Sequence, residues 1–421
     1  MSDLSITQSS LSAHLDTAAS AIEAQVIAWR RDLHEHPELG NREFRTAGLV
    51  AAHLRALGLD EVRTEVAHTG VVGLLKGALP GPCVALRADM DGLPVTEQVD
   101  LPFASKARTQ WNGEEVGVMH ACGHDCHVAI LMGVAQVLAG LRSQLRGSVK
   151  FIFQPAEEMP PEGEEGGAEL MIRQGTLEKP VPAAIFGLHV TSRLPLGVVG
   201  YRPGPTMASS DKLKITVHGK QTHGAAPWAG VDPIVTSAQI VLGLQTVVSR
   251  TQDITREPAV VTIGAIKGGV RENIIPDSVE MRGTIRSFNE EMRDDIHERI
   301  TTMAEAIAKG SRAGCTVCIT KNYPVTVNDP KLTEAMVPTL DRVAGPGGLQ
   351  LVPKVTGAED FSFFQRLIPG LFFFIGVTPP GVDPSKAFSN HSPKFYADER
   401  AFVLGLRSLL HETCDYLESR A

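Results

Sequence analysis

Residues 118–127 read VMHACGHDCH, and an apolar helical pattern over 128–141 follows directly. Within this stretch Cys122 and His124 are separated only by Gly123, so a thiolate and an imidazole can turn toward one point. Sulfur and imidazole nitrogen together are the ligand chemistry of zinc and its divalent neighbours. Because one such pair cannot complete a metal site, a site here would need further ligands and a base from elsewhere in the chain.

Length and composition limit the class of protein. A chain of 421 residues is too long for one ordinary hydrophobic core and predicts two or three domains. The net charge of -8 provides no basic surface for nucleic acid, and no uncharged apolar run is long enough for a transmembrane helix. The polar N-terminus lacks the order of a secretory signal, and six scattered cysteines argue against a disulfide framework. We therefore expect a cytoplasmic protein that binds neither nucleic acid nor membranes.

The alternation of apolar runs and helical patterns predicts the fold class. Strands are expected at 71–76, 83–87, 149–153, 183–188 and 371–376, and helices at 13–34, 43–57, 126–141, 166–174 and 395–419. Fully apolar strands that alternate with helices are typical of a mainly parallel sheet covered by helices on both faces. The sequence therefore predicts an α/β domain.

The middle of the chain has a different pattern. Half-exposed strands and amphipathic helices follow one another at 211–219, 232–249, 259–267, 278–286, 289–310 and 316–321. Strand-helix-strand-strand-helix-strand is the order of the ferredoxin-like α+β unit, which has an antiparallel sheet. We therefore predict an inserted domain at 207–322 and a main domain formed by 1–206 and 323–421.

Polar residues follow the ends of several predicted parallel strands. They are Asp89, Asp91, Glu157, Glu158 and His189, and the Cys122–His124 pair precedes a predicted helix. In open α/β sheets, ligands bind in the crevice at the carboxyl ends of the strands. Because all of these residues reach that edge, we expect them to form one site. When one of two adjacent carboxylates binds a metal, its neighbour can hold the water that the metal acidifies.

Each residue taken alone also has a structural interpretation. His189 fits a hydrogen-bonded structural histidine, Asp89 fits a turn cap, and Cys122 fits a small buried hydrophobic residue. His391, in a Ser/Pro-rich loop, has weaker support from spacing and fits a capping role. In the inserted domain, His223 lies in a Gly/Pro-rich loop, and this position favours a role in substrate contact. The convergence on one sheet edge favours the metal site over these separate interpretations.

A series of sequence blocks resembles one known family throughout nearly the whole chain. The blocks are LHEHPELGNREFRTA (33–47), ALRADMDGLP (85–94), MHACGHDCHVA (119–129), IFQPAEE (152–158), GLHV (187–190), THGAAPWAGVDP (222–233), NIIPDSVEMRGTIR (273–286), TGAEDFSFF (356–364) and FFFIGV (372–377). The chain resembles the aminoacylase/carboxypeptidase family of metal-dependent amidohydrolases, in the branch of hippurate hydrolase, N-acyl-amino-acid amidohydrolases and auxin-conjugate hydrolases. The resemblance implies a zinc-peptidase-like catalytic domain and an inserted lid that forms a homodimer or a higher homo-oligomer.

The resemblance also implies roles for particular residues. The implied metal ligands are Cys122, His124, Glu158, His189 and His391. Five mixed ligands fit two divalent ions, with zinc suited to the sulfur and nitrogen donors and manganese, cobalt or nickel as alternatives. Glu157 is the implied general base, and His223 from a neighbouring subunit's lid is the implied donor to the oxyanion. Asn273, Arg286 and the backbone at Gly357 are candidates to bind the substrate, and Asp91 and Asp125 are candidates to orient the ligand imidazoles.

The implied reaction is hydrolysis of the amide bond of an N-acyl amino acid to a carboxylic acid and a free amino acid. Hippurate-like, N-acetyl and other acyl conjugates all belong to this class of small-molecule substrate. A dipeptidase or carboxypeptidase, and an N-acetyl-diaminopimelate deacetylase, are alternatives on the same scaffold. An inactive metal-binding protein is a further alternative, but the adjacent Glu157 and Glu158 form a complete site and argue against it.

Overall fold

The computed structural model describes residues 2–111 and 113–420 and divides into two compact units. The first comprises the chain up to Gly204, Asn328–Val352 and the chain from Phe363 onward, and the second comprises Pro205–Val327 and Pro353–Ser362. The predicted boundaries at 206/207 and 322/323 differ from these by a few residues. Residues 353–362 were predicted in the main domain, but backbone hydrogen bonds join them to the second unit, where the Val355 N–H donates to the Thr206 carbonyl at 3.0 Å.

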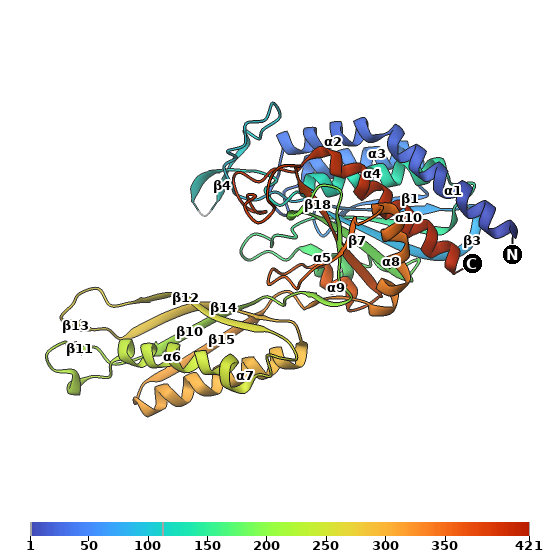
Figure 1. Ribbon diagram of the computed structural model, residues 1–421. Coiled ribbons are helices and arrows are strands. Elements are labelled where there is room, and N and C mark those ends of the chain that lie inside the picture. The colour runs from blue at the N-terminus through green and yellow to red at the C-terminus, as the bar shows by residue number, and fades with distance from the viewer. Residues whose placement is uncertain (1, 112, 421) are drawn as a thin grey trace. The chain divides into compact units, whose positions relative to one another are not determined.

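An eight-stranded sheet with the strand order β1-β2-β6-β3-β7-β18-β8-β17 organises the first unit (Figure 1). In that order the strands are Glu61–Val66, Gly70–Lys76, Arg146–Gln154, Leu79–Asp89, Ala184–Pro195, Gly370–Thr378, Val199–Tyr201 and Leu349–Leu351. The central strands β6, β3, β7 and β18 are parallel to one another. The structure thus confirms the predicted α/β class with a mainly parallel sheet.

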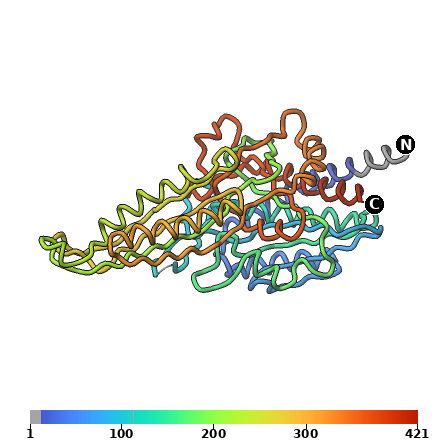
Figure 2. The backbone as a smooth tube through the Cα atoms, turned by 90° about the horizontal axis from the view of Figure 1, so that it is seen from below, coloured from blue at the N-terminus to red at the C-terminus, as the bar shows by residue number. Residues whose placement is uncertain are grey.

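The helices of the chain outside the second unit's sheet pack against this sheet or against one another. They are α1 (Ser2–Ala21), α2 (Glu23–Glu35), α3 (Phe44–Ala56), α4 (His124–Gly140), α5 (Gly167–Arg173), α8 (Pro330–Ala344), α9 (Phe361–Gln365), η2 (Glu399–Ala401) and α10 (Phe402–Ser419). Nearly every residue of α4 is buried, because α4 contacts the sheet as well as α2 and α10. Helices α1 and α10 run side by side in Figure 2. No helix among residues 2–111 and 113–420 is long and apolar enough to span a membrane.

The second unit has the predicted ferredoxin-like topology. Its sheet order is β12-β14-β10-β15, with strands Ala259–Gly268, Ser278–Ser287, Asp211–His218 and Gly314–Lys321, all antiparallel. Helices α6 (Pro233–Thr251) and α7 (Glu290–Gly310) pack on this sheet through a core that includes Leu244 and Ile296. The structure therefore confirms the expected α+β unit.

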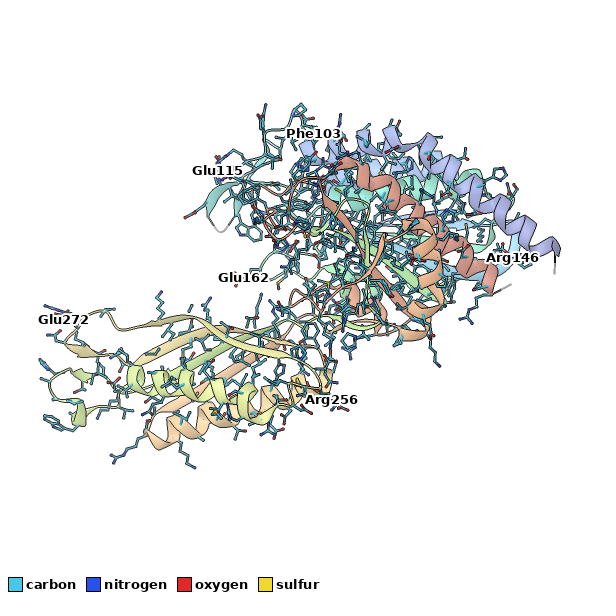
Figure 3. All side chains as sticks on the ribbon, viewed as in Figure 1. Phe103, Glu115, Arg146, Glu162, Arg256 and Glu272 are labelled. Carbon is cyan, nitrogen blue, oxygen red and sulfur yellow. The ribbon has the colours of Figure 1, made fainter. Side chains whose placement is uncertain are left out.

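Short elements complete the chain. Strands β11 (Thr222–His223) and β13 (Ile274–Ile275) pair with each other beyond the main sheet of the second unit, next to the 3-10 helix η1 (Pro227–Ala229). Strands β9 (Gly204–Met207) and β16 (Thr326–Asn328) form another pair. Strands β4 (Arg108–Trp111) and β5 (Glu114–Gly117) form a hairpin that projects from the first unit, with Glu115 labelled on it in Figure 3.

Candidate active site

The predicted ligand stretch forms a tight turn at the start of α4. Gly123 has φ 94°, and a Cβ atom there would lie 2.3 Å from Val190 Cγ2 on β7, so only glycine fits. The Asn390 side chain donates to the carbonyls of Cys122 at 2.9 Å and Val190 at 3.0 Å. The His391 N–H donates to the Ala121 carbonyl at 2.8 Å. The turn, β7 and the His391 loop are thus fixed to one another.

Two groups of potential ligands share the Cys122 thiol. Cys122 Sγ lies 3.3 Å from His189 Nε2 and 3.2 Å from His391 Nε2, and His391 Nε2 lies 2.8 Å from Glu158 Oε1. The ligand atoms of Cys122, His124 and His189 all lie within 4.8 Å of one another, as do those of Cys122, Glu158 and His391. Two groups with one shared thiolate are an arrangement that fits two adjacent divalent ions.

Hydrogen bonds at Nδ1 orient the imidazoles of His124 and His189 so that their Nε2 atoms face the ligand group. His124 Nδ1 donates to Asp91 Oδ1 at 3.1 Å, and His189 Nδ1 donates to the Val190 carbonyl at 2.7 Å. The Nε2 atom of His124 is fully buried and has no hydrogen-bond partner within the described parts of the chain. A buried imidazole nitrogen without a hydrogen-bond partner fits a metal ligand, with Asp91 as its orienting carboxylate.

The surrounding charge also suits a cation. Burial lowers the pKa of His124, but the charges of Asp89 and Asp91 outweigh burial and raise it to about 10. Burial raises the pKa of the Cys122 thiol well above its usual value, and the negative charges of Glu158, Glu157 and Asp89 raise it further. This concentration of carboxylates around a thiol and imidazoles gives the site a negative potential that attracts divalent ions.

Asp89 was expected at this sheet edge, but its hydrogen bond with His127 was not predicted. His127 Nδ1 donates to Asp89 Oδ1 at 2.6 Å, and His127 Nε2 accepts from the Val190 N–H at 2.9 Å. Asp89 also accepts from Arg87. Although Asp89, His124 and His127 lie close enough to hold an ion, both ring nitrogens of His127 are already used. These hydrogen bonds therefore fix the middle of β7, which carries His189. The sequence signals for this pair were the position of Asp89 after a predicted strand and the three-residue spacing between His124 and His127 on one helix.

Asp125 differs from its predicted role. Its carboxylate lies 2.8 Å from Arg30 Nε and 2.7 Å from His34 Nδ1, both on α2. It was expected to orient a ligand imidazole, but its own partners turn it away from the ligands. The reason is that Asp125 follows His124 directly on a helix, where successive side chains point in different directions.

Comparison with known proteins identifies the family. A profile of the Peptidase family M20/M25/M40 matches residues 85–411. This chain belongs to that family. This chain is 41% identical over 385 residues to thermostable carboxypeptidase 1 of Saccharolobus solfataricus, and the match covers 91% of this chain and 93% of that protein. It is also 38% identical over 389 residues to N-acetylcysteine deacetylase of Bacillus subtilis, and this match covers 92% of this chain and 95% of that protein.

A solved structure supports a site for two metals in this M20 protein. The Bacillus subtilis protein described as a dinuclear metal binding peptidase from the M20 family superposes with a TM-score of 0.80 at 35% identity, covering 95% of this chain and 99% of that chain. Together with the two ligand groups around Cys122, this similarity supports a binuclear site for divalent metals. The protein is a hydrolase of the M20 family.

The residues that were predicted to contact the substrate lie on the second unit. His223 is exposed on β11, and Asn273 is its neighbour, because the Gly224 N–H donates to the Asn273 carbonyl at 2.8 Å. Both lie at the end of the unit where Figure 3 labels Glu272. Arg286 lies at the other end of the ten-residue strand β14. The Gly357 carbonyl accepts from the Ala208 N–H at 2.9 Å.

The spacing along β14 separates two residues that were both candidates to bind the substrate carboxylate. The extended strand from Ser278 to Arg286 spans roughly 26 Å, which is more than one small substrate can bridge. Asn273 and Arg286 of one chain therefore do not converge on a single carboxylate. Both residues lie in one short sequence block, and their separation arises from the extended conformation of the strand between them.

Proposed function

We propose that this protein hydrolyses the amide bond of N-acyl amino acids and releases a carboxylic acid and a free amino acid. Hippurate-like, N-acetyl and other acyl conjugates are the candidate substrates. The observation that carries the proposal is the position of Glu157, whose Oε2 lies 3.8 Å from His124 Nε2 and whose sequence neighbour Glu158 belongs to a ligand group. A buried carboxylate at the edge of the ligand set is placed to move protons.

The ligand set suggests how the ions are divided. Cys122, His124 and His189 would hold one ion, and Cys122, Glu158 and His391 would hold the other. Zinc suits the thiolate and imidazole donors, and manganese, cobalt or nickel are compatible with the same set. When bound, the two ions would acidify a water molecule and polarise the substrate carbonyl. Glu157 accepts the proton from the attacking water and returns it to the leaving amine nitrogen.

Arg286 is the candidate to bind the substrate carboxylate. Its side chain is half-buried and forms no hydrogen bond or ion pair with any other residue that the structure describes. The nearby carboxylate of Asp211 is already bound by Arg293 and by His297, the latter at 2.7 Å. An unpaired guanidinium can bind a carboxylate with two parallel hydrogen bonds, so Arg286 provides the charge that an amino-acid substrate requires.

The separation along β14 supports a homodimer in which subunits share their sites. Because His223 and Asn273 lie far from Arg286 in the same chain, we infer that they act in the site of a neighbouring subunit, where His223 would stabilise the oxyanion. Exposed apolar residues on the second unit, including Leu242 (71% exposed) and Ile266 (57%), offer a surface for that contact. Ile266 lies on the edge strand β12, which pairs only with β14 among the described strands.

A second candidate function is peptide hydrolysis. The 41% identity to a carboxypeptidase favours it, and the proposed proton transfers apply equally to a peptide bond. The two functions differ only in the group attached to the amino-acid nitrogen.

A substrate panel separates the candidates. The protein should be loaded with Zn²⁺ or Mn²⁺ and assayed with hippurate, N-acetyl, long-acyl and indole-acetyl amino acids, a dipeptide, a carboxypeptidase substrate and N-acetyl-diaminopimelate. We expect kcat/KM for at least one acyl amino acid to exceed that for the dipeptide and the carboxypeptidase substrate by at least about tenfold, a difference of about 1.4 kcal/mol. Faster cleavage of either peptide would overturn the proposal in favour of the second function.

A further inference from the structure

Residues Gly40–Glu43 pack against the loop that carries Glu157 and Glu158. A Cβ atom at Gly40 would lie 3.1 Å from Ala156 Cα, so the two backbones are in close contact there. The Asn41 side chain donates to the Glu165 carbonyl at 3.0 Å, and Arg42 pairs with Glu164. Neither the ligand set nor the proposed proton transfers use this segment. Its sequence GNRE nevertheless contributes a fully buried carboxylate, that of Glu43.

Two buried carboxylates hold three successive backbone amides of the loop. Glu43 Oε1 accepts from the Ala156 N–H at 2.8 Å. Asp91 accepts from the next two, with Oδ1 3.1 Å from Glu157 N and Oδ2 2.9 Å from Glu158 N. Consecutive N–H groups that point to one side form a concave anion-binding turn. The backbone direction at 156–158 therefore depends on both carboxylates.

The turn also contains an unfavourable conformation that needs support. Ala156 has φ 51°, in the left-handed region that side chains other than glycine rarely adopt. Such conformations persist where the surroundings fix them from several directions. Glu43 fixes the backbone at Ala156 itself by accepting its N–H. The other oxygen of Glu43, Oε2, accepts from the Thr69 hydroxyl at 2.5 Å. Glu43 is thus held in place while it holds the loop.

We propose that Glu43 is a positioning residue that fixes the 156–158 turn, so that Glu158 can bind a metal and Glu157 can act as the base. This inference rests on the proposed metal site and extends it to a residue that lies 113 positions from Ala156 in the sequence. Glu43 acts only through the backbone amide of Ala156. Asp91, by contrast, contacts the ligand His124 directly.

Metal binding by the full-length protein tests the role of Glu43 without any substrate. Apoprotein is titrated with Mn²⁺ by calorimetry, and its thermal unfolding is measured in parallel. The wild type should bind two Mn²⁺ per chain. Glu43→Met, which keeps the side-chain length but removes the acceptor, should weaken one of the two binding events by about 10- to 100-fold, the usual effect of losing an outer-shell partner. Glu43→Gln keeps an acceptor of the same reach and should recover most of the lost affinity.

Glu38→Met, which removes a carboxylate acceptor in the same way, is the matched control from just before the Gly40–Glu43 segment. The Glu38 carboxylate accepts from the N–H groups of Arg45 and Thr46, both at 2.9 Å, at the start of α3 and does not contact the 156–158 turn. This variant should lower Tm but keep both Mn²⁺ affinities within about twofold, since a lost helix cap affects folding and not the site.

The outcomes of the titration separate the possibilities. Two wild-type affinities in folded Glu43→Met, with only a lower Tm, would overturn the proposal in favour of a purely structural role. If Glu43→Met does not fold, Thr69→Val decides, because it removes the hydroxyl that holds Glu43. A lower affinity for the second Mn²⁺ in Thr69→Val supports the proposal, and unchanged affinity for both ions overturns it. Wild-type protein that binds two Mn²⁺ but cleaves no acyl amino acid would reject the proposed substrate class and leave this test valid.

Discussion

Glu157 is the residue on which the proposed chemistry depends most directly. Its carboxylate is buried beside His124, and its backbone is held by Asp91. Glu157→Gln preserves the shape of the side chain but cannot accept a proton, so kcat should fall by about 10²- to 10⁴-fold. Steady-state kinetics measures this loss, and calorimetry should still show two bound Mn²⁺. The adjacent control Glu158→Gln should lose one metal instead. A Glu157→Gln variant with nearly wild-type kcat would refute the assignment of the base.

At the same scale, some site residues could be predicted from sequence and others could not. Placement at strand ends predicts that Glu157, Glu158 and His189 converge, and the structure brings their side chains to the Cys122–His124 turn. The ends of parallel strands are a local feature that sequence periodicity can locate. The bonds from Asp89 to His127 and from Glu43 to Ala156 join positions 38 and 113 residues apart. No local pattern encodes such pairs, because they depend on the complete fold.

Helix α10 contains a buried acid that should make stability depend on pH. Neither carboxylate oxygen of Glu412 has a hydrogen-bond partner within the described residues, and burial raises its pKa well above the ordinary value of 4.5, with Asp415 adding to the shift. Between 4.5 and the folded-state pKa, the folded chain keeps a proton that the unfolded chain releases. The free energy of unfolding should therefore fall as pH rises through this window.

Glu412→Gln tests this dependence. Urea unfolding between about pH 5 and about pH 8 should show a stability gain over the wild type that grows with pH, because the amide does not ionise. Glu418→Gln on the same helix is the control, since Glu418 is 35% exposed and lies 3.7 Å from Arg146. It should leave the pH dependence of the wild type unchanged. Parallel curves for the wild type and Glu412→Gln would show that Glu412 stays in one protonation state across the window.

Element boundaries show where periodicity stops being informative. The predicted helix at 13–34 is two helices, α1 and α2, because Ile22 leaves the helical region with ψ 3°. The helix expected from 395 begins as η2 at Glu399, where the Asp398 side chain accepts from the Arg400 N–H. Strand β1 was not predicted, since EVRTEV lacks the continuous apolar run of the central strands. Apolar patterns locate buried elements, whereas caps and edge strands depend on hydrogen bonds that the pattern does not carry.

At the scale of the whole molecule, the inferred exchange of His223 between subunits predicts complementation. His223→Ala and Glu157→Gln should each be nearly inactive. After the two variants are mixed at equal amounts and allowed to exchange subunits, roughly a quarter of the wild-type rate should return, because half of the dimers are mixed and each has one complete site. Activity measured before and after exchange, with dimers followed by light scattering, checks this result. Adding Leu242→Glu to both variants should abolish the recovery, since it places a charge on the proposed apolar contact. Mixed dimers that stay inactive would show that His223 acts within its own chain.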